Sequence, residues 1–260
     1  MSLVLFEQQG PIGKITSNKP EQLNAINPEM GDELKALIPT LNQKKDLKVV
    51  IITGAGKAFS AGGNLQFILD RTQRNAEQNK QDMIEFYSKF LSVRNLEMPT
   101  IAMINGPAIG AGFCVALACD LRIASDNAKM GANFAKLGLS SGMGGLYFIT
   151  KLLGPAGAAD LLFTGRTLDA AEAKELGLLN KLCPLSDLEK VTMDFAEQIA
   201  ANAPLAIKIM KKGIQKAVIA DLHEVFDYES SGQAQCFQTA DLKEGIAAIQ
   251  EKRPPVFKGI

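Results

Sequence analysis

Residues 99–125 read PTIAMINGPAIGAGFCVALACDLRIAS, and this stretch contains the pattern that decides the fold. A run typical of a buried strand, Thr100 to Asn105, leads into the glycine-rich loop GPAIGAG, and an apolar helix begins at Ala111. A loop of this kind leaves backbone N–H groups unpaired at the positive end of a helix dipole. Such groups bind a phosphate, a carboxylate or a developing oxyanion.

The same arrangement occurs once before in the chain, where the strand-like run VVIIT at 49–53 enters the loop TGAGKAFSAGGNL. Neither loop matches a dinucleotide-binding fingerprint, because Phe59 stands where the first loop needs its third glycine and the second loop has the wrong spacing. A Walker A loop is excluded because no Ser or Thr follows Lys57. Two such loops in one chain favour a binding role over turns that are tightened only for packing.

The flanking sequence predicts one α/β core followed by helices. The other predicted elements are strands at 4–8, 12–16, 120–124, 129–130 and 178–182, and helices at 28–42 and 70–97. From Gly144 onward the pattern is otherwise helical. We therefore expect an α/β core over residues 1–195 and a C-terminal helical region over residues 196–260, which packs on a neighbouring subunit.

The charge balance and the apolar runs exclude two classes of partner. Lys and Arg together number 28, as do Asp and Glu, so no net charge remains to hold a polyanion, and no basic run marks a nucleic-acid surface. The start, MSLVLFEQQGPIGKI, lacks a basic region followed by an apolar one, and no stretch approaches the ~20 apolar residues of a membrane span. We expect a cytoplasmic protein that binds neither nucleic acid nor a membrane.

The cysteine pattern predicts no metal site and no disulfide framework. The chain has four cysteines, at 114, 119, 183 and 236, and they form no CxxC pair. The first two lie in one apolar segment, where burial as small apolar side chains is the favoured interpretation.

The two loops and the sequence around them resemble the enoyl-CoA hydratase/isomerase, or crotonase, family. The resemblance is carried by KAFSAGGNL at 57–65, the stretch at 99–125, LGLSSGMGG at 137–145 and LFTGRTLDAAEAKELGLLNKL at 162–182, and it extends over essentially the whole chain. It implies a crotonase-like α/β core, a spiral of ββα turns, with a C-terminal helical trimerisation region. It also implies homotrimers or dimers of trimers, an acyl-CoA substrate and no cofactor other than the CoA of that substrate.

Two positions match the residues whose backbone N–H groups form the oxyanion hole of the family. They are Gly63, the last residue of AGG, and Ala111, which follows the first glycine of GAG. A thioester that reacts at its α or β carbon passes through an enolate, which two preorganised amides can stabilise by ~3–4 kcal/mol each. The resemblance further assigns the CoA pocket to Lys57, Ala58, Ala61, Gly62, Asn64, Leu65 and Gln66.

The sequence departs from the family at the acidic positions. Hydration of an enoyl-CoA needs one carboxylate to activate water and a protonated one to supply the α proton. The positions that hold the acids of the family are Cys114, Phe134 and Gly142 in this chain. These vacancies leave the acid and the base of the reaction unassigned, and Phe134 favours an apolar wall around the acyl group.

Several other side chains are candidates to replace the missing acids. The candidates are Cys114 as a nucleophile or proton carrier, Asp70 and Glu77 on the segment after the first loop, Ser140, Ser141 and Tyr147 as polar orienting groups, and His223 as part of a triad. For each of them a packing or solvated role is favoured over a catalytic one. Asp120 matches a structural Asp of the family.

The sequence therefore predicts an acyl-CoA-processing enzyme of the hydratase/isomerase group that stabilises a thioester enolate. Two alternatives stay open. In one, the same amides stabilise the tetrahedral oxyanion of thioester hydrolysis. In the other, the chain is a non-catalytic paralogue that kept the acyl-CoA pocket and lost the acids.

Overall fold

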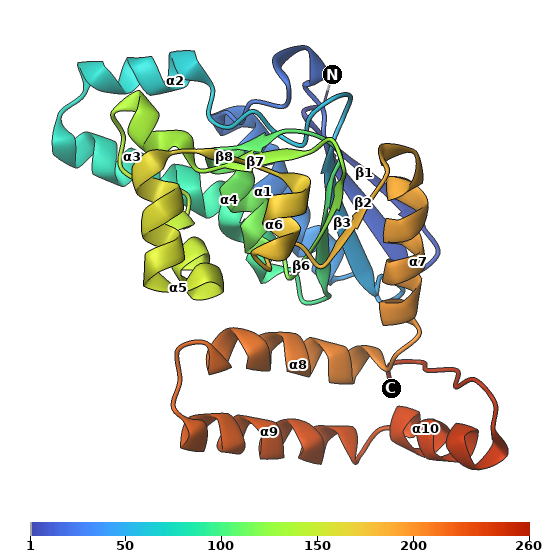
Figure 1. Ribbon diagram of the computed structural model, residues 1–260. Helices are drawn as coiled ribbons and strands as arrows, with labels where there is room; N and C mark the ends of the chain where they lie inside the picture. The colour runs from blue at the N-terminus through green and yellow to red at the C-terminus, as the bar shows by residue number, and fades with distance from the viewer. Residues whose placement is uncertain (1) are drawn as a thin grey trace.

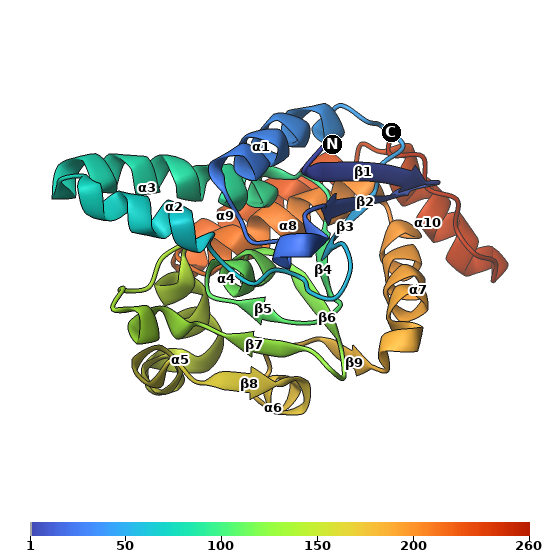
Figure 2. The same cartoon turned by 90° about the horizontal axis from the view of Figure 1, so that it is seen from above.

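The central sheet of the computed structural model, which describes residues 2–260, has the strand order β1-β2-β3-β4-β6-β9 (Figure 2). Its strands are β1 (Val4–Gln9), β2 (Ile12–Ser17), β3 (Val49–Gly54), β4 (Thr100–Ile104), β6 (Leu121–Ser125) and β9 (Lys181–Cys183). The β1–β2 hairpin is antiparallel and the remaining pairs are parallel. A smaller sheet joins β5 (Ala108–Ile109), β7 (Lys129–Gly131) and β8 (Thr167–Asp169). The predicted α/β class is confirmed.

Helices surround these sheets and continue to the C-terminus (Figure 1). They are α1 (Pro28–Asn42), α2 (Leu65–Asp70), α3 (Ala76–Phe90), α4 (Ala111–Ala118), α5 (Gly145–Thr164), α6 (Ala170–Glu175), α7 (Leu188–Ala200), α8 (Pro204–Ala217), α9 (Leu222–Cys236) and α10 (Ala240–Glu251). The predicted unit of strand, glycine loop and helix is present twice, as β3 with α2 and as β4 with α4.

Strands β3 and β4 are buried along their whole length because side chains on both faces of the sheet are covered. On one face, Val50 and Ile52 pack into the larger apolar cluster, which includes α1 and α4. On the other face, Val49 and Ile51 pack into a smaller cluster with α7. The two strands that precede the glycine loops are thereby fixed in the middle of the molecule.

Helix α7 corrects the predicted division at residue 195, which falls inside this helix. Its buried residues Leu188, Thr192, Ala196 and Ala200 recur at a spacing of four, so they form one stripe. This stripe packs against the central sheet. The α/β core therefore extends to the end of α7, and the separate helical region begins at α8.

The helix predicted over 70–97 is shorter: it is α3, with short 3₁₀ segments at Arg71–Gln73 and Leu91–Asn95, and the separate helix α2 precedes it. Helix α2 begins earlier, at Leu65, because the side chain of Asn64 accepts a hydrogen bond from the N–H of Phe67. Helix α3 begins at Ala76, where Asn75 and Gln78 form a capping box. The amphipathic pattern alone did not show where α3 begins, because its capping residues lie inside a polar segment.

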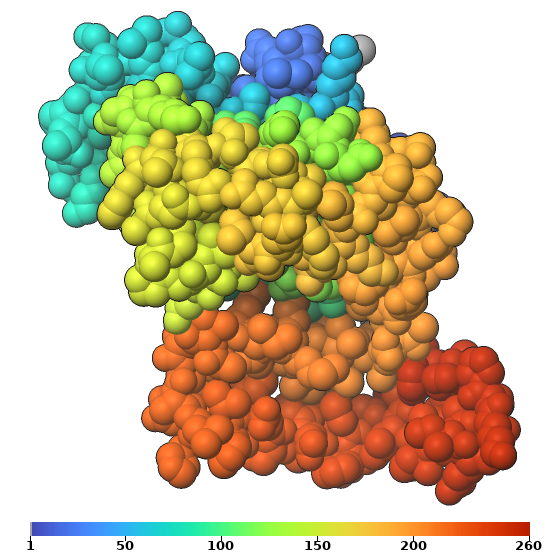
Figure 3. Space-filling model, viewed as in Figure 1, coloured from blue at the N-terminus to red at the C-terminus, as the bar shows by residue number. Residues whose placement is uncertain are grey.

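Helices α8, α9 and α10 form a layer below the core in the view of Figure 1, and Figure 3 shows this layer projecting from the main body. Lys211 of α8 is buried, and its ammonium lies 2.8 Å from the carboxylate of Asp120 and donates to the carbonyl of Met98. The same carboxylate accepts hydrogen bonds from the N–H and the hydroxyl of Thr100. Asp120 thus joins the start of β4 to the C-terminal layer.

Helix α5 is, within residues 2–260, the one helix whose length and composition would allow it to cross a membrane. It is not one continuous helix, because Gly154 has the non-helical torsion angles φ 69° and ψ 174°, and Pro155 follows it. Each half is shorter than the ~20 residues that a span requires.

Candidate active site

The two glycine loops are joined by backbone hydrogen bonds. The N–H of Ser60 donates to the carbonyl of Pro107 (3.1 Å), and the N–H of Ile109 donates to the carbonyl of Ser60 (2.9 Å). Helix α4 also approaches the first loop closely, since a Cβ on Gly112 would lie 2.6 Å from the Cβ of Ser60. The start of α4 is therefore held in a fixed position relative to the first loop.

Gly62 brings the two predicted oxyanion-hole residues to the same place. Its φ of 97° favours glycine, and an added Cβ would lie 2.7 Å from the carbonyl oxygen of Ile109 and 3.8 Å from the N of Ala111. Any side chain at this position would separate the loops. The next residue, Gly63, consequently lies beside the first turn of α4.

The N–H groups of Gly63 and Ala111 donate no hydrogen bond to the rest of the chain within residues 2–260. Ala111 is the first residue of α4, so its N–H has no partner in the helix. The adjacent N–H of Gly110, by contrast, donates to the carbonyl of Gly131 (2.7 Å). Both free amides belong to residues that line one cavity. This arrangement suits an oxygen atom that gains negative charge.

This cavity has a volume of about 520 Å³. Its lining residues come from the two loops, from α2 and α3, and from the segment between β7 and α5: Ala61, Gly62, Gly63, Leu65, Phe67, Ile68, Arg71, Asn79, Met83, Phe86, Tyr87, Gly110, Ala111, Asn133, Phe134, Leu137, Leu139, Ser140, Gly142 and Met143. Apolar side chains predominate, and Phe134 is one of them. Arg71 is the one charged residue among them, and no carboxylate is present.

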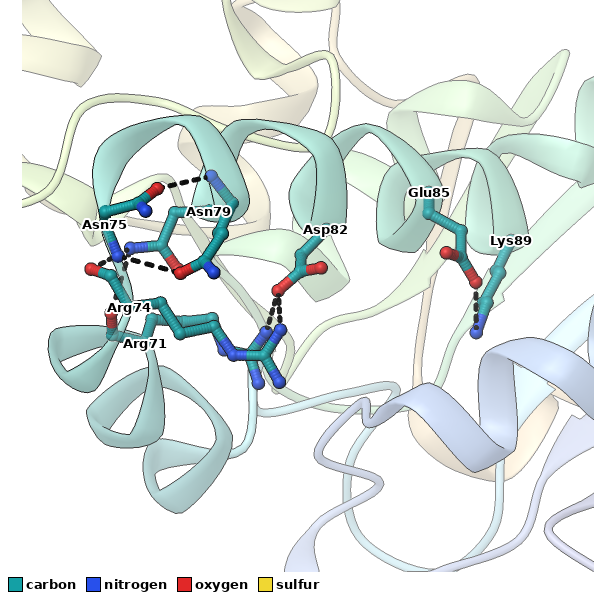
Figure 4. Close-up of polar contacts among 8 residues, drawn as sticks. Arg71, Arg74, Asn75, Asn79, Asp82, Glu85 and Lys89 are labelled. Carbon is teal, nitrogen blue, oxygen red and sulfur yellow. Dashed lines mark hydrogen bonds and ion pairs between the residues drawn. The ribbon is translucent and has the colours of Figure 1, made fainter.

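Stacked rings fix the wall formed by α2 and α3. The rings of Phe67 and Phe86 stack with their centroids 4.7 Å apart, and the guanidinium of Arg71 lies 4.5 Å from the centroid of Phe67. Figure 4 shows Arg71 and Arg74 meeting at the carboxylate of Asp82, which lies 2.7 Å from Nη1 of Arg71. The single negative charge of Asp82 is therefore shared between the guanidinium groups of Arg71 and Arg74.

Two buried polar atoms of the same wall have no hydrogen-bond partner within residues 2–260. They are Nε of Arg71, a donor, and Oδ1 of Asn79, an acceptor. The amide nitrogen of Asn79 donates to the carbonyl of Arg71 (2.9 Å), which fixes the orientation of the amide.

The three vacant acid positions have different surroundings. Cys114 is completely buried in α4 and does not line the cavity, and burial raises the pKa of its thiol to about 12. Phe134 and Gly142 line the cavity. An ionised nucleophile is thus absent from all three positions at neutral pH.

Tyr87 of α3 is a candidate functional residue that the sequence motifs do not indicate. It lines the cavity, and its hydroxyl oxygen lies 2.5 Å from the point where a Cβ on Gly142 would stand. Burial, and then the negative charge that Cys114 would carry if ionised, raise the pKa of Tyr87, while the backbone of Met143 lowers it. The signal that could have found it is helical spacing: residues 83, 86, 87 and 90 are all apolar or aromatic, which indicates that this face of α3 points inward.

Ser141 lies near Cys114 and Gly145. Its hydroxyl oxygen is buried without a partner within residues 2–260. A Cβ on Gly145 would lie 2.5 Å from this oxygen and 3.0 Å from the sulfur of Cys114. Ser141 therefore faces Cys114, behind the cavity wall.

The predicted CoA-binding residues divide into two groups. Ala61, Gly62 and Leu65 line the cavity, whereas Lys57 is exposed, Ala58 is buried, Asn64 caps α2, and Gln66 binds Asp70. Of the other candidates, Ser140 lines the cavity, Asp70, Glu77 and Tyr147 are exposed outside it, and His223 lies in α9, where its ring contacts Phe226. The structure thus places His223 in the C-terminal layer, away from the cavity lining.

Comparisons with known proteins agree with this architecture. The family model for enoyl-CoA hydratase/isomerase matches residues 7–260. A short-chain-enoyl-CoA hydratase from Clostridium acetobutylicum is 34% identical over 251 residues, which cover 96% of this chain and 95% of the relative. The crystal structure of an enoyl-CoA hydratase from Bacillus anthracis superposes with a TM-score of 0.93 at 34% identity and covers 99% of this chain and 100% of that one. An enoyl-CoA hydratase from Polaromonas sp. JS666 gives a TM-score of 0.92 at 31% identity and covers 98% and 99% of the two chains. The fold, the glycine loops and these matches together mean that the chain belongs to the enoyl-CoA hydratase/isomerase family.

Proposed function

We propose that this acyl-CoA-processing family member acts on enoyl-CoA thioesters and stabilises their enolate with the N–H groups of Gly63 and Ala111. The observation that carries the proposal is the pair of unpaired amides on loops that are hydrogen-bonded to each other. Amides held in this way need no reorganisation when the thioester oxygen becomes negative. The dipole of α4 adds to the attraction at Ala111.

The apolar cavity accommodates the acyl group in this proposal. Closure around the thioester removes water, which strengthens the interaction between the amides and the enolate oxygen. The first glycine loop holds the CoA portion, with Ala61, Gly62 and Leu65 at the cavity and Lys57 exposed for the CoA phosphates. The proposed chemistry uses no cofactor beyond the CoA of the substrate.

We also propose that the chain assembles as a homotrimer or a dimer of trimers through its C-terminal layer. Large apolar side chains of this layer are exposed in the single chain, among them Ile214, Ile219, Leu222, Phe237 and Ile249. An apolar hollow of about 400 Å³ between α8 and α10 supports the same proposal. A neighbouring subunit that covers these side chains would remove their apolar surface from water.

The test is a panel of enoyl-CoA esters, including crotonyl-CoA and cyclic esters, incubated with the purified protein and followed by mass spectrometry. Addition of one water, or isomerisation without a mass change, is the expected result. Release of free CoA would point to hydrolysis instead. Tight binding with every ester returned unchanged would mean that the vacant acid positions mark a binding protein.

The role of the amide is tested by Ala111→Pro. Proline is compatible with the first position of a helix, so the substitution removes one donor and leaves α4 intact. We expect turnover to fall by about 10²–10³-fold, as for the loss of one oxyanion-hole donor. Ala76→Pro is the matched control because it places proline at the first position of α3, at an exposed residue. Unchanged turnover in Ala111→Pro would refute the assignment.

A further inference from the structure

We propose that the phenol of Tyr87 is the proton donor of this site and delivers the α proton to the enolate of the acyl-CoA substrate. The proposal rests on the proposed function, because it needs an enolate held by the two backbone amides. Tyr87 would supply the acid that the cavity otherwise lacks, because the positions that hold acids in the family are Cys114, Phe134 and Gly142 in this chain.

The proposal depends on one geometric fact: the hydroxyl of Tyr87 occupies the space that a side chain at position 142 would need. The hydroxyl oxygen of Tyr87 lies 2.5 Å from the point where the Cβ of a larger residue 142 would stand. A side chain at 142 and the phenol therefore exclude each other. In this chain the volume that would belong to an acidic side chain of residue 142 is filled from α3 by a hydroxyl.

Tyr87 is the one tyrosine of the described chain whose position fits the role. Of the three tyrosines, Tyr228 uses its hydroxyl to bind the carbonyl of Ile209, and Tyr147 is exposed on α5 outside the cavity lining. Tyr87 lines the same cavity as Gly63 and Ala111. Its ring is positioned by Phe86, whose centroid is 6.5 Å away.

The electrostatic surroundings keep the phenol protonated. The titratable group whose charge acts on it is Cys114, and the thiol of Cys114 stays neutral because burial raises its pKa to about 12. Arg71 lines the same cavity. On its own helix, Asp82, Glu85 and Lys89 line a separate hollow. No carboxylate in the lining competes to donate a proton, and the raised pKa of Tyr87 keeps its phenol protonated at neutral pH, which is the form that can donate.

The proton balance of the step is simple. Addition of water, or of another nucleophile, to the β carbon of a 2-enoyl-CoA places an electron pair in the enolate. That pair forms a C–H bond at the α carbon as the O–H bond of Tyr87 breaks, and the thioester carbonyl is restored. When water is the nucleophile, the proton that it loses as its oxygen bonds to the β carbon passes to the solvent, and the phenolate regains a proton from the solvent. The net change is the addition of one water. The substrate class is therefore the 2-enoyl-CoA thioesters.

Tyr87→Phe tests the proposal directly. It removes the hydroxyl and keeps the ring, and we expect turnover of the enoyl-CoA to fall by about 10²–10⁴-fold, as for the loss of a general acid. The dissociation constant for the saturated acyl-CoA is expected to change by less than threefold. In the wild type the rate falls at alkaline pH as the phenol ionises, and the variant lacks this alkaline limb. Tyr147→Phe is the matched control and keeps the wild-type rate.

Gly142→Ala is a second test that keeps the phenol. The φ of Gly142 lies outside the left-handed region, so alanine fits the backbone, but its Cβ displaces the hydroxyl of Tyr87. We expect a loss of turnover in the wild-type background and a much smaller further loss in the Tyr87→Phe background. A Tyr87→Phe variant within threefold of the wild-type rate, or still carrying the alkaline limb, would refute the role of Tyr87 and leave the proposed function standing. If the wild type turns over no ester, the proposed function itself fails, and the role of Tyr87 fails with it.

Discussion

Burial decides what the thiols of Cys114 and Cys119 can do. Both side chains are fully buried, and burial is the main reason why the pKa of each thiol is raised to about 12. The thiolate is the reactive form of cysteine, so neither side chain is a nucleophile at neutral pH. This agrees with the sequence-based interpretation of Cys114 as a packing residue. A hydroxyl group is therefore a better candidate for the acid of the site than a thiol.

Alkylation follows from the same burial. Under native conditions at pH 8, iodoacetamide should modify the partly exposed Cys236 and leave Cys114 and Cys119 unmodified. Both buried thiols should react once the chain is unfolded in urea. Peptide mass mapping measures the sites, and modification of native Cys114 at the rate of Cys236 would contradict the burial.

The buried thiols also predict how stability depends on pH. Each native thiol holds its proton up to a pKa of about 12, whereas the ordinary value is 9.0. The native state therefore binds more protons than the unfolded state between these values, and the free energy of unfolding falls as pH rises. The expected slope is about 1.4 kcal/mol per pH unit for each thiol above pH 9.

Urea unfolding of the wild type and of Cys114→Ala between pH 8 and pH 10.5 measures this slope. The variant should lose the contribution of one thiol, about 1.4 kcal/mol per pH unit. Cys236→Ala, which removes a partly exposed thiol, is the control for the loss of a cysteine side chain. Equal slopes in the wild type and Cys114→Ala would mean that the Cys114 thiol already ionises in the native state.

At the scale of single elements, one buried lysine joins the C-terminal layer to the core. Lys211 is 5% exposed and pairs with Asp120, whereas the neighbouring Lys212 is 60% exposed and lies 3.6 Å from Glu97. Removing one partner of a buried pair costs about 3–5 kcal/mol, and the 27% exposure of Asp120 reduces that figure. Surface pairs contribute about 0–1 kcal/mol.

We therefore expect Lys211→Ala to lower the free energy of unfolding by about 2–3 kcal/mol, and Lys212→Ala to lower it by less than about 1 kcal/mol. Urea unfolding monitored by circular dichroism gives both values. Similar losses in the two variants would show that the contact of Lys211 with the core does not hold the layer in place.

Elements were predictable where a capping signal and an apolar stripe agree. Helix α1 begins where predicted because Pro28 occupies its first turn and Asn27 caps it, and it ends at Asn42 as predicted. The sequence did not predict β5, because two residues are too few to show a period. It did not predict β8 either, because these three residues lie between two helices in a stretch whose pattern is otherwise helical. The contact between Tyr87 and Gly142 could not be predicted because the two residues are far apart in the sequence. The helix α3 and the loop before α5 meet only in the folded structure.

At the scale of the whole molecule, the C-terminal layer exposes more apolar surface than a single chain in water would favour. On α10, Ile246 is 50% exposed and Ile249 is 80% exposed, and both line the apolar hollow against α8. Exposed apolar surface of this extent, bordered by polar residues, marks a protein contact. The proposed trimer supplies that contact with a second copy of the same layer.

Size-exclusion chromatography with light scattering tests this assembly. The wild type should have three or six times the 27.9 kDa of one chain. Ile249→Lys should shift the protein toward the monomer with unchanged circular dichroism, because a charge at this position would lose its hydration in the contact. Gln250→Lys adds the same charge to the adjacent exposed residue and keeps the oligomer. A monomeric wild type would refute the proposed assembly. A trimeric Ile249→Lys would show that the subunits meet elsewhere, so that the exposed face of α10 stays in water after assembly.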